Sequence, residues 1–408
     1  MINLQTAETP LTHDDFGRLV SEVQAQTCFR KPLLYAIGGQ VLTNGKEPVL
    51  ASVRYPVVNG PDQNLGTLAV LQGVLGFDGS SPVVNGLMTS IHIDHALRMF
   101  TPFANEPEGH RNIQALRAAK AAVQLGRPVA FTAIFEDVDP IGVEDSTLKL
   151  YGLSNRFFRP NQLNLMKIFA RLPNVAWVGD RPLDEEEVEN ALMRVGFGDG
   201  SFSPQMVDKF PLFIHRMNAL ALGVRIMDQN KVRLGAYLGD GTVLMPGASY
   251  INFNAGTESG MIEGRISSSA MVGKGSDIGG GASILGVLSG GNKTPISVGR
   301  NCLLEVNSTL GITIGDAVIV SSNCAVLAST NVKVLLQGHP RFGQVVKAVT
   351  LAGISGVTFR RNDLLNDDGV AVDYPGEMHV VRTARNIEFA ERLDNGKDIL
   401  NADLHAHN

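Results

Sequence analysis

Acidic side chains are the candidates for chemistry in the glycine-rich second half of the chain. No histidine occurs between His215 and His339. Where no histidine is present, a carboxylate is the natural acceptor for a proton that a reacting group must lose. The candidates are Asp228, Asp240, Glu258, Glu263, Asp277, Glu305 and Asp316.

Glu263 is the strongest candidate because it stands beside a break in a regular pattern, in the segment "INFNAGTESGMIEGRIS" (251–267). Arg265 follows two residues later, and in an extended segment the two side chains point the same way. An arginine there could hold a substrate carboxylate through two parallel hydrogen bonds. The alternative is a solvated surface ion pair, which is common and weak. Spacing alone leaves both interpretations open.

The regular pattern is an aliphatic residue, or Tyr250, at every sixth position. It runs from Ile226 to Tyr250, continues in a shifted frame through 266–284, and returns at 314–332. A helix repeats every 3.6 residues and a strand every 2, so neither produces this period. A hexapeptide period is typical of a parallel β-helix with about 18 residues per coil. Its aliphatic residues point inward and its small residues turn the corners.

The frame of this pattern shifts near residues 254–260, 288–296 and 311–313. We expect loops or bulges extruded from the β-helix at these places. Loops carried by a rigid scaffold are where binding and catalysis concentrate.

Composition changes along the chain predict four parts: a mixed α+β domain (1–205), a linker (206–222), the β-helix (223–334) and a small C-terminal extension (335–408). In the first part, residues 31–42 and 127–138 read as strands. Residues 108–126 and 184–200 read as amphipathic helices. The glycine- and proline-punctuated series 59–86 predicts short strands and loops. In the last part, residues 384–396 predict a short helix.

The bulk composition excludes several classes of protein. The 408 residues carry a formal charge of −5, which argues against nucleic acid or an anionic membrane as the main partner. Three cysteines are too few for a disulfide framework or a zinc site. The N-terminus has no signal-peptide pattern, and no apolar run reaches the roughly 20 residues of a membrane span. We therefore expect a cytoplasmic protein.

Several long motifs carry a family resemblance. They are "VDKFP" (207–211), "VRLGAYLGDGT" (232–242), "NFNAGTESGMIEGR" (252–265), "VGKGSDIGGGASILGVLSGG" (272–291), "ISVGRNCLL" (296–304), "FRRN" (359–362) and "LHAHN" (404–408). Together they resemble the tetrahydrodipicolinate N-succinyltransferase family in its longer bacterial form. The resemblance covers most of residues 140–408, is dense over 207–310, and is thin before residue 140.

The resemblance implies a left-handed β-helix in a homotrimer with active sites between subunits. It implies transfer of succinyl from succinyl-CoA, a co-substrate rather than a bound cofactor, to the amine of ring-opened tetrahydrodipicolinate (L-2-amino-6-oxopimelate) in lysine and diaminopimelate synthesis. Glu263 falls on the catalytic carboxylate, acting as an anhydride-forming nucleophile or as a base. The succinyl-CoA-binding positions fall on Arg265, Gly280, Ser283, Ser321, Ser322, Lys347, Arg360, Arg361 and Asn362.

Departures from the family pattern leave alternatives open. Asn230 and Gly247 replace acids that the family associates with an axial metal, so we expect that metal site to be absent or altered. The family's "GANSG" reads "EVNST" (305–309), and its "EAGLYITAGT" reads "SSNCAVLAST" (321–330). The chain could therefore use another acyl donor or amine, or be a catalytically silent trimeric paralogue.

Overall fold

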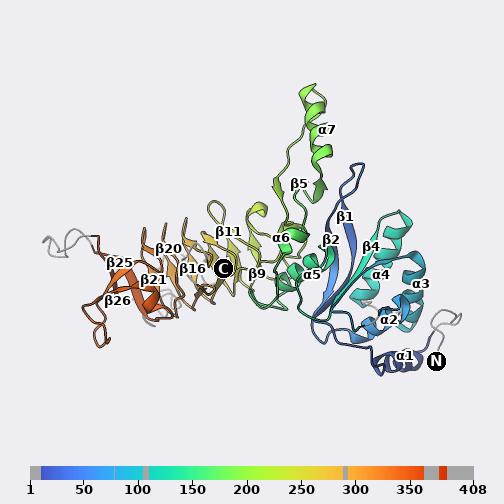
Figure 1. Ribbon diagram of the computed structural model, residues 1–408, viewed down its shortest axis with the longest axis horizontal. Coiled ribbons are helices and arrows are strands. Elements are labelled where there is room, and N and C mark those ends of the chain that lie inside the picture. The colour runs from blue at the N-terminus through green and yellow to red at the C-terminus, as the bar shows by residue number, and fades with distance from the viewer. Residues whose placement is uncertain (1–10, 78, 104–109, 288–292, 363–375, 384–408) are drawn as a thin grey trace. The chain divides into compact units, whose positions relative to one another are not determined.

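The computed structural model describes residues 11–77, 79–103, 110–287, 293–362 and 376–383. It divides the chain into two compact units, residues 1–158 with 162–211 and residues 159–161 with 212–408. Figure 1 colours the chain from one terminus to the other. The helix expected at 384–396 lies outside the described residues. Within the described ranges, no helix is both long and apolar enough to span a membrane.

The first unit is built around a four-stranded antiparallel sheet in the order β2-β1-β4-β3. Different helices pack against the two faces of this sheet. Tyr35 and Phe131 pack into a core shared with helices α1 to α4. Leu34 points the other way, since a Cβ atom on Gly152 of α5 would lie 2.6 Å from it. The strands are β1 (Leu34–Leu42), β2 (Leu50–Asn59), β3 (Val83–Met88) and β4 (Val129–Ile134).

Five helices flank this sheet, and one of them corrects the sequence interpretation. The series 59–86 contains helix α2 rather than only short strands and loops. Residues 67–72 of α2 are all buried, so the helix has no polar face to reveal a helical period. Its ends are marked by left-handed backbone at Asn64 and Gly76. The helices are α1 (His13–Gln24), α2 (Leu65–Leu75), α3 (Ser90–Met99), α4 (Arg111–Gln124) and α5 (Val143–Ser154).

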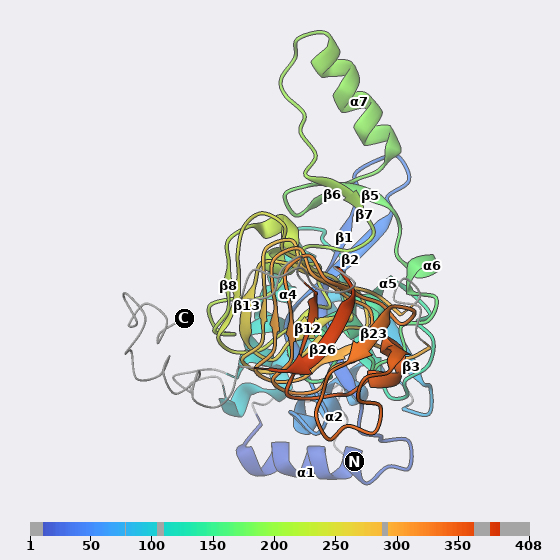
Figure 2. The ribbon, with the colours of Figure 1, turned by 90° about the vertical axis from the view of Figure 1, so that its left-hand side faces the viewer.

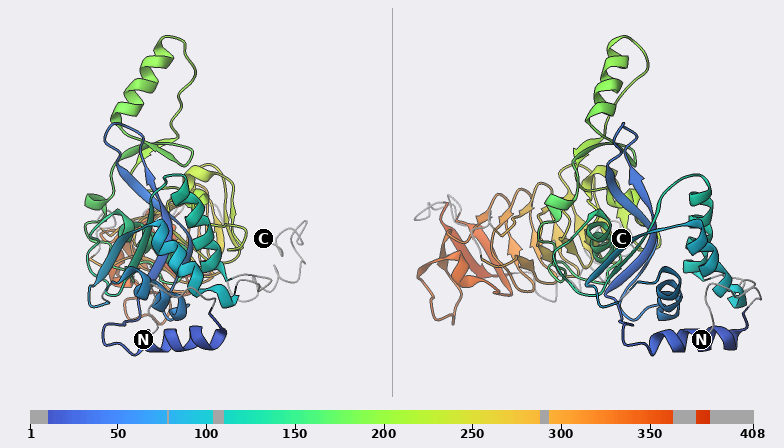
Figure 3. Two further views of the ribbon diagram at one scale, coloured as in Figure 1. Left: turned by 90° about the vertical axis from the view of Figure 1, so that its right-hand side faces the viewer. Right: turned by 45° about the vertical axis from the view of Figure 1, so that its right-hand side comes forward.

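A small three-stranded sheet, in the order β6-β5-β7, completes the first unit. Its strands are β5 (Val175–Val178), β6 (Arg181–Leu183) and β7 (Met206–Asp208), preceded by the short helix α6 (Ile168–Arg171). Helix α7 (Glu185–Gly196) begins at the expected acidic segment, where the Asp184 carboxylate accepts the backbone N–H of Glu187. No residue of α7 is buried, and Figure 3 shows it extending beyond the small sheet.

The second unit stacks short parallel strands into three sheets, which the chain visits in a fixed order over residues 242–310. Figure 1 shows the successive coils following one another along this unit. We call them sheets I, II and III. Sheet I contains β8 (Arg225–Ile226), β10 (Thr242–Leu244), β13 (Gly260–Ile262), β16 (Asp277–Ile278), β19 (Leu303–Leu304), β21 (Ile319–Val320) and β25 (Val357–Arg361). Sheet II contains β11 (Tyr250–Ile251), β14 (Arg265–Ile266), β17 (Ser283–Ile284), β20 (Thr309–Leu310) and β22 (Ala325–Val326). Sheet III contains β9 (Tyr237–Leu238), β12 (Gly256–Thr257), β15 (Met271–Val272) and β18 (Ser297–Val298).

The aliphatic residue that recurs every six positions is the inward-facing residue of its strand. Ile266, Val272, Ile278 and Ile284 are each 0% exposed and belong in turn to sheets II, III, I and II. They share one continuous core with the other inward residues of the stack. Figure 2 views this part of the chain nearly end-on, with successive coils lying over one another. Each fully buried aliphatic side chain contributes roughly 1.5–3 kcal/mol, so the stacking of coils holds the unit together.

The break near residue 260 is a shortening rather than an extruded loop. The inward residues there are Ile251, Thr257, Ile262 and Ile266, of which the last three are only five and four residues apart. The inward residue of β11 is Ile251, not the expected Tyr250. No loop lifts out at 254–260; the corner between β13 and β14 is reduced to two residues, Glu263 and Gly264.

The shift expected at 311–313 has the same cause. Leu310 and Ile314 are both inward and lie only four residues apart, so that corner is also shortened. At 288–296 the chain does gain residues, because the inward Ile284 and Val298 are separated by fourteen positions. Residues 288–292 themselves lie outside the described ranges.

The C-terminal strands extend sheet I beyond β21. β25 continues the parallel stack, pairing Val320 with Phe359. β26 (Met378–Arg382) then pairs antiparallel with β25 and parallel with β23 (Asn331–Val334), which pairs antiparallel with β24 (Val345–Lys347). The order at this end is therefore β24-β23-β26-β25.

Candidate functional site

The candidate site lies on the edge of the stack where the chain passes from sheet I to sheet II. We call this line of corners the site edge. Strand pairing sets its register, because the inward residues of sheet I pair from coil to coil, and the residue that follows each of them falls in one column. The column is Glu263, Gly279, Glu305, Ser321 and Arg360. Each member before Arg360 donates its backbone N–H to the carbonyl of the inward residue one coil further on.

The Glu263 side chain is half-buried at the shortened corner and lies beside the neighbouring coil. Its Oε2 atom is 3.6 Å from the place a Cβ atom of Gly280 would occupy. Among the described residues, no hydrogen bond or ion pair engages its carboxylate. An unengaged carboxylate beside a glycine corner can accept a proton from a ligand that lies over that glycine.

Arg265 is exposed at the start of sheet II, where strand pairing places it next to Ser283. Its Nε and Nη2 atoms donate to the Ser283 Oγ atom at 3.0 and 2.8 Å. In the part of the chain that the structure describes, no ion pair joins Arg265 to Glu263. The surface ion pair weighed from the sequence is therefore absent there. The serine instead orients the guanidinium. Because serine is neutral, the positive charge of Arg265 stays available to an anionic ligand.

Two glycines of this site have different surroundings. A Cβ atom on Gly264 would lie 2.3 Å from the carbonyl oxygen of Ala282, so only glycine lets the shortened corner form. A Cβ atom on Gly280 would meet nothing closer than Glu263 and Val306, both at 3.6 Å. Gly280 therefore leaves room for a methyl-sized group in contact with both the Glu263 carboxylate and Val306.

Of the other candidate carboxylates, all but Asp240 are engaged within the chain. Asp228 accepts the backbone N–H of Asn230, and Asp277 accepts that of Met261. Glu258 accepts the Lys274 backbone N–H at 3.1 Å and pairs with Arg159. Asp240 has no hydrogen-bond or ion-pair partner among the described residues, and it is exposed on a different edge. These arrangements leave Glu263 as the unengaged carboxylate of the site edge.

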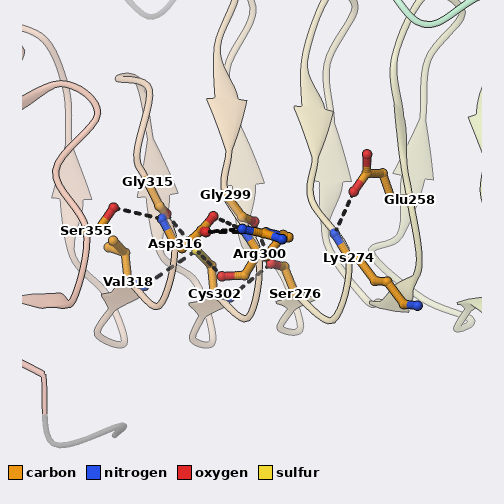
Figure 4. A network of polar contacts seen from close by, with 10 residues as sticks. All are labelled: Glu258, Lys274, Ser276, Gly299, Arg300, Cys302, Gly315, Asp316, Val318 and Ser355. Atoms are coloured by element: carbon orange, nitrogen blue, oxygen red, sulfur yellow. Dashed lines mark hydrogen bonds and ion pairs between the residues drawn. The ribbon is translucent and has the colours of Figure 1, made fainter. Parts of the chain in front are cut away.

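Figure 4 shows the edge between sheets III and I, where polar contacts join successive coils. Asp316 accepts the backbone N–H of Arg300 at 2.8 Å and pairs with its guanidinium at 2.9 Å. The backbone N–H and the guanidinium of Arg300 hold the pKa of Asp316 below its usual value. The Asp316 N–H in turn donates to Ser355 Oγ. This edge holds coils together and does not present a free catalytic group.

Ser321 and Ser322, expected to contact the acyl donor, follow β21 on the site edge. Ser321 donates its N–H to the Phe359 carbonyl. Ser322 is bound to Glu305, whose Oε2 atom accepts both the Ser322 N–H and its hydroxyl at 2.9 Å. The sequence interpretation gave Glu305 no role in binding; only the register of the strands shows that it reaches Ser322.

The expected basic residues separate into two places. Arg360 and Arg361 end β25 and are exposed, with Arg360 closing the column of the site edge. Asn362 follows and donates its N–H to the Glu377 carbonyl. Lys347 lies on β24, with β23 and β26 between it and β25, and its Nζ atom donates to the Ser329 carbonyl at 2.9 Å. The structure thus does not bring Lys347 beside the two arginines.

Asn230 and Gly247, which replace the family's metal-associated acids, lie near the first coils. Asn230 belongs to a short 3-10 turn, and Gly247 adopts a φ of +91°. Within the described ranges, no group of three or more His, Cys, Asp or Glu side chains is placed to hold a metal ion.

Comparisons with known proteins agree on one family. A family model described as the tetrahydrodipicolinate N-succinyltransferase N-terminal region matches residues 14–170, the part of the chain where the sequence motifs were thin. A 2,3,4,5-tetrahydropyridine-2,6-dicarboxylate N-succinyltransferase of Sulfurovum sp. is 36% identical, over 95% of this chain and 99% of its own length. The enzyme of the same name from Campylobacter jejuni is 38% identical, over 86% of this chain and 94% of its own.

A solved structure is also similar. It is a candidate 2,3,4,5-tetrahydropyridine-2-carboxylate N-succinyltransferase from Campylobacter jejuni, with a TM-score of 0.81 and 35% sequence identity. The match covers 91% of this chain and 98% of that one. The similarity therefore extends over both units and not only over the repeat region.

Proposed function

Because this chain belongs to the tetrahydrodipicolinate N-succinyltransferase family, we propose that it transfers succinyl from succinyl-CoA to the amine of ring-opened tetrahydrodipicolinate, a step of lysine and diaminopimelate synthesis. One observation carries the assignment to a site. Glu263 is an unengaged carboxylate beside the open space at Gly280, and an oriented cation, Arg265, stands two residues away.

The chemistry follows from these positions. The acceptor amine attacks the thioester carbonyl and loses a proton, which the Glu263 carboxylate takes. The carbon–sulfur bond then breaks, and the proton passes to the departing thiolate, giving the succinyl amide and free CoA. The backbone N–H of Gly280 has no acceptor among the described residues, and we assign it to the oxyanion that forms at the thioester carbonyl oxygen. We favour the base role for Glu263 because this route needs no separate anhydride.

Arg265 is proposed to hold the free carboxylate of the succinyl group. Its guanidinium is fixed by Ser283 at the start of sheet II, two residues after Glu263. A planar guanidinium binds a carboxylate through parallel, charge-assisted hydrogen bonds. A donor that lacks this carboxylate, such as acetyl-CoA, gains nothing from it, so Arg265 selects succinyl-CoA.

The rest of the site edge is proposed to carry the CoA arm. From Glu263 to Arg360 the column crosses four strand spacings, about 19 Å at about 4.8 Å each. That length suits an extended pantetheine arm whose phosphates reach Arg360 and Arg361. Ser321 and Asn362 lie along the same path, whereas Lys347 would reach the nucleotide only from the side of β24.

The architecture proposed for the second unit is a left-handed parallel β-helix. Its support is the fixed visiting order of three parallel sheets and the shared inward core. We further propose a homotrimer, in which heterologous contacts close a ring and a neighbouring chain covers the site edge. A cytoplasmic location is proposed because succinyl-CoA is the co-substrate.

The test is an assay of thiol release by the whole protein. Wild-type protein is incubated with succinyl-CoA or acetyl-CoA, each with and without the tetrahydrodipicolinate acceptor. We expect thiol release that needs the acceptor and is at least tenfold faster with succinyl-CoA. Equal rates with acetyl-CoA would indicate an acyltransferase with another donor. No release under any condition would indicate a catalytically silent paralogue.

A further inference from the structure

Glu305 presents one bound and one unbound carboxylate oxygen on the site edge. Oε2 accepts the Ser322 N–H and hydroxyl, both at 2.9 Å. In the described ranges, nothing donates to Oε1. The carboxylate is thus held by Ser322 through Oε2, and Oε1 can still accept a hydrogen bond from a ligand. The side chain is half-buried, next to the exposed Val306 that borders the space at Gly280.

The distance of Glu305 from Glu263 is set by strand pairing. Ile262, Ile278 and Leu304 are paired in successive coils, so Glu305 stands two coils beyond Glu263 in the same column. Two strand spacings amount to about 9.6 Å. A ligand that extends along this edge from Glu263 passes Glu305 at that distance.

The pantetheine arm of CoA has a repeat of the same length. Three backbone bonds of an extended peptide span about 3.6 Å, so a four-bond repeat spans about 4.8 Å. Four bonds separate the thioester carbon from the nitrogen of the first amide, and four more separate the two amide nitrogens. The second amide nitrogen therefore lies about 9.6 Å from the thioester carbon when the arm is extended.

We propose that the free oxygen of Glu305 accepts the N–H of the second amide of pantetheine, the amide between β-alanine and pantoate. This inference rests on the proposed function, since it places the thioester carbon at Glu263. A carboxylate acceptor makes a shorter and stronger hydrogen bond than a neutral one. Glu305 thus recognises the arm of the donor and fixes how far the thioester reaches along the edge.

The test compares two donors that differ in this amide. Succinyl-CoA contains both amides, whereas succinyl-N-acetylcysteamine ends after the first. In Glu305→Gln, the amide oxygen can still accept from Ser322, but the free acceptor becomes an NH2 donor. We expect KM for succinyl-CoA to rise about tenfold with kcat nearly unchanged, because binding rather than the chemical step is weakened. With succinyl-N-acetylcysteamine, wild type and variant should behave alike.

Two controls accompany this comparison. Glu22→Gln removes the same charge from an exposed position of α1 and should change neither donor's KM. Ser322→Ala removes the hydroxyl that grips Glu305, so it should raise KM for succinyl-CoA in the same direction. Because both changes act through one contact, the double variant should be no worse than Glu305→Gln alone.

Each outcome decides the inference. An unchanged KM for succinyl-CoA in Glu305→Gln, or an equal loss with both donors, would overturn it. In both cases the wild-type protein still transfers succinyl to the acceptor, so these results would not contradict the proposed function. Failure of the proposed function would look different, because wild-type protein would then release no thiol from succinyl-CoA even with the acceptor present.

Discussion

At the scale of residues, the site depends on which polar groups are already satisfied. Most carboxylates in the described part of the second unit bind backbone N–H groups or cations, as Glu258 and Asp316 do. The carboxylate of Glu263 is not engaged by any of the described residues, although it is half-buried. Burying part of a charged group without a partner costs stability, and such costs are typical of functional sites.

Donor selection should reside in Arg265. Replacing it by alanine removes the cation that is proposed to hold the succinyl carboxylate. We expect the ratio of kcat/KM for succinyl-CoA to that for acetyl-CoA to fall at least tenfold, since a hydrogen bond to a charged group is worth about 1.5–3 kcal/mol. Steady-state kinetics with both donors measure this ratio.

The matched variant is Ser283→Ala, which removes the hydroxyl that orients Arg265 but keeps the charge. It should lower the same ratio by a smaller factor. A ratio unchanged in Arg265→Ala would show that another group selects the donor.

The sequence predicted part of this site and missed the rest for a physical reason. Glu263 and Arg265 stand beside a visible break, and family motifs indicate their roles. The bond from Arg265 to Ser283 and that from Ser322 to Glu305 join residues 18 and 17 positions apart. Such contacts depend on the register between coils. A break in the repeat shifts this register, and the spacing of residues in the sequence does not determine by how much.

At the scale of elements, the shortened corner is what places Glu263. The sequence showed that the period changes between residues 250 and 266, but a change of frame is compatible with an insertion or a deletion. Packing decides between them. Gly264 lets the chain pass within contact of the Ala282 carbonyl, so the corner needs only two residues.

Two glycine substitutions separate folding from function at this corner. Gly264→Ala would put a Cβ atom 2.3 Å from the Ala282 oxygen, and overpacking of this kind costs about 1–3 kcal/mol. We expect a drop of several degrees in the thermal unfolding midpoint. Gly280→Ala meets its nearest atoms at 3.6 Å and should keep that midpoint.

Gly280→Ala should lower activity although it keeps the thermal midpoint, because the new methyl group fills the space beside the Glu263 carboxylate. We expect kcat/KM for succinyl-CoA to fall at least tenfold; a misplacement of about 1 Å can cost a hundredfold. Wild-type kinetics in this variant would mean that the acyl group does not pass over Gly280.

The edge between sheets III and I should give stability a defined pH dependence. Arg300 lowers the pKa of Asp316, so the folded state favours the charged carboxylate. Its stabilising effect is complete well above the unfolded pKa of about 3.9 and is lost as the pH falls through the lower folded value. Asp316→Asn should therefore be less stable than wild type at pH 7.

The difference between Asp316→Asn and wild type should shrink as the pH is lowered below about 4, as followed by chemical denaturation. A difference that stays constant from neutral to acidic pH would show that the Asp316 charge does not contribute to stability.

Helix α2 shows the limit of patterning at this scale. The series 59–86 contains many glycines and a proline near each end, which is typical of short strands and loops. The helix in its middle is apolar on all sides and buried, so it lacks the alternation of polar and apolar faces by which helices are recognised. The amphipathic helices α4 and α7 were predicted correctly because each keeps a polar face.

At the scale of the whole molecule, the repeat region was the most predictable part. Period six fixes which residues point inward, and the core at residues 266–284 follows that prediction without exception. The N-terminal unit has no comparable repeat, so its fold class is predictable from the sequence but the order of its strands is not. Its relationship to the family is shown by the match at residues 14–170 and by relatives that align over nearly the whole chain.

The proposed homotrimer has a direct physical consequence. The mass in solution should be three times the 43.7-kDa mass of the chain. Sedimentation equilibrium at several concentrations measures it, and we expect one species at micromolar protein. A stable monomer that still transfers succinyl would contradict active sites shared between neighbouring chains.

Glu263 is proposed to accept the proton of the attacking amine at the site edge, and a kinetic comparison of wild type with one variant tests this role. Thiol release from saturating succinyl-CoA and acceptor is measured for wild type and for Glu263→Gln, which keeps the size of the side chain but cannot take up the proton. Loss of a general base costs about 10²–10⁴-fold, so we expect kcat to fall by at least a hundredfold, with an unchanged thermal midpoint. A Glu263→Gln protein that releases thiol at the wild-type rate would show that Glu263 is not the proton acceptor.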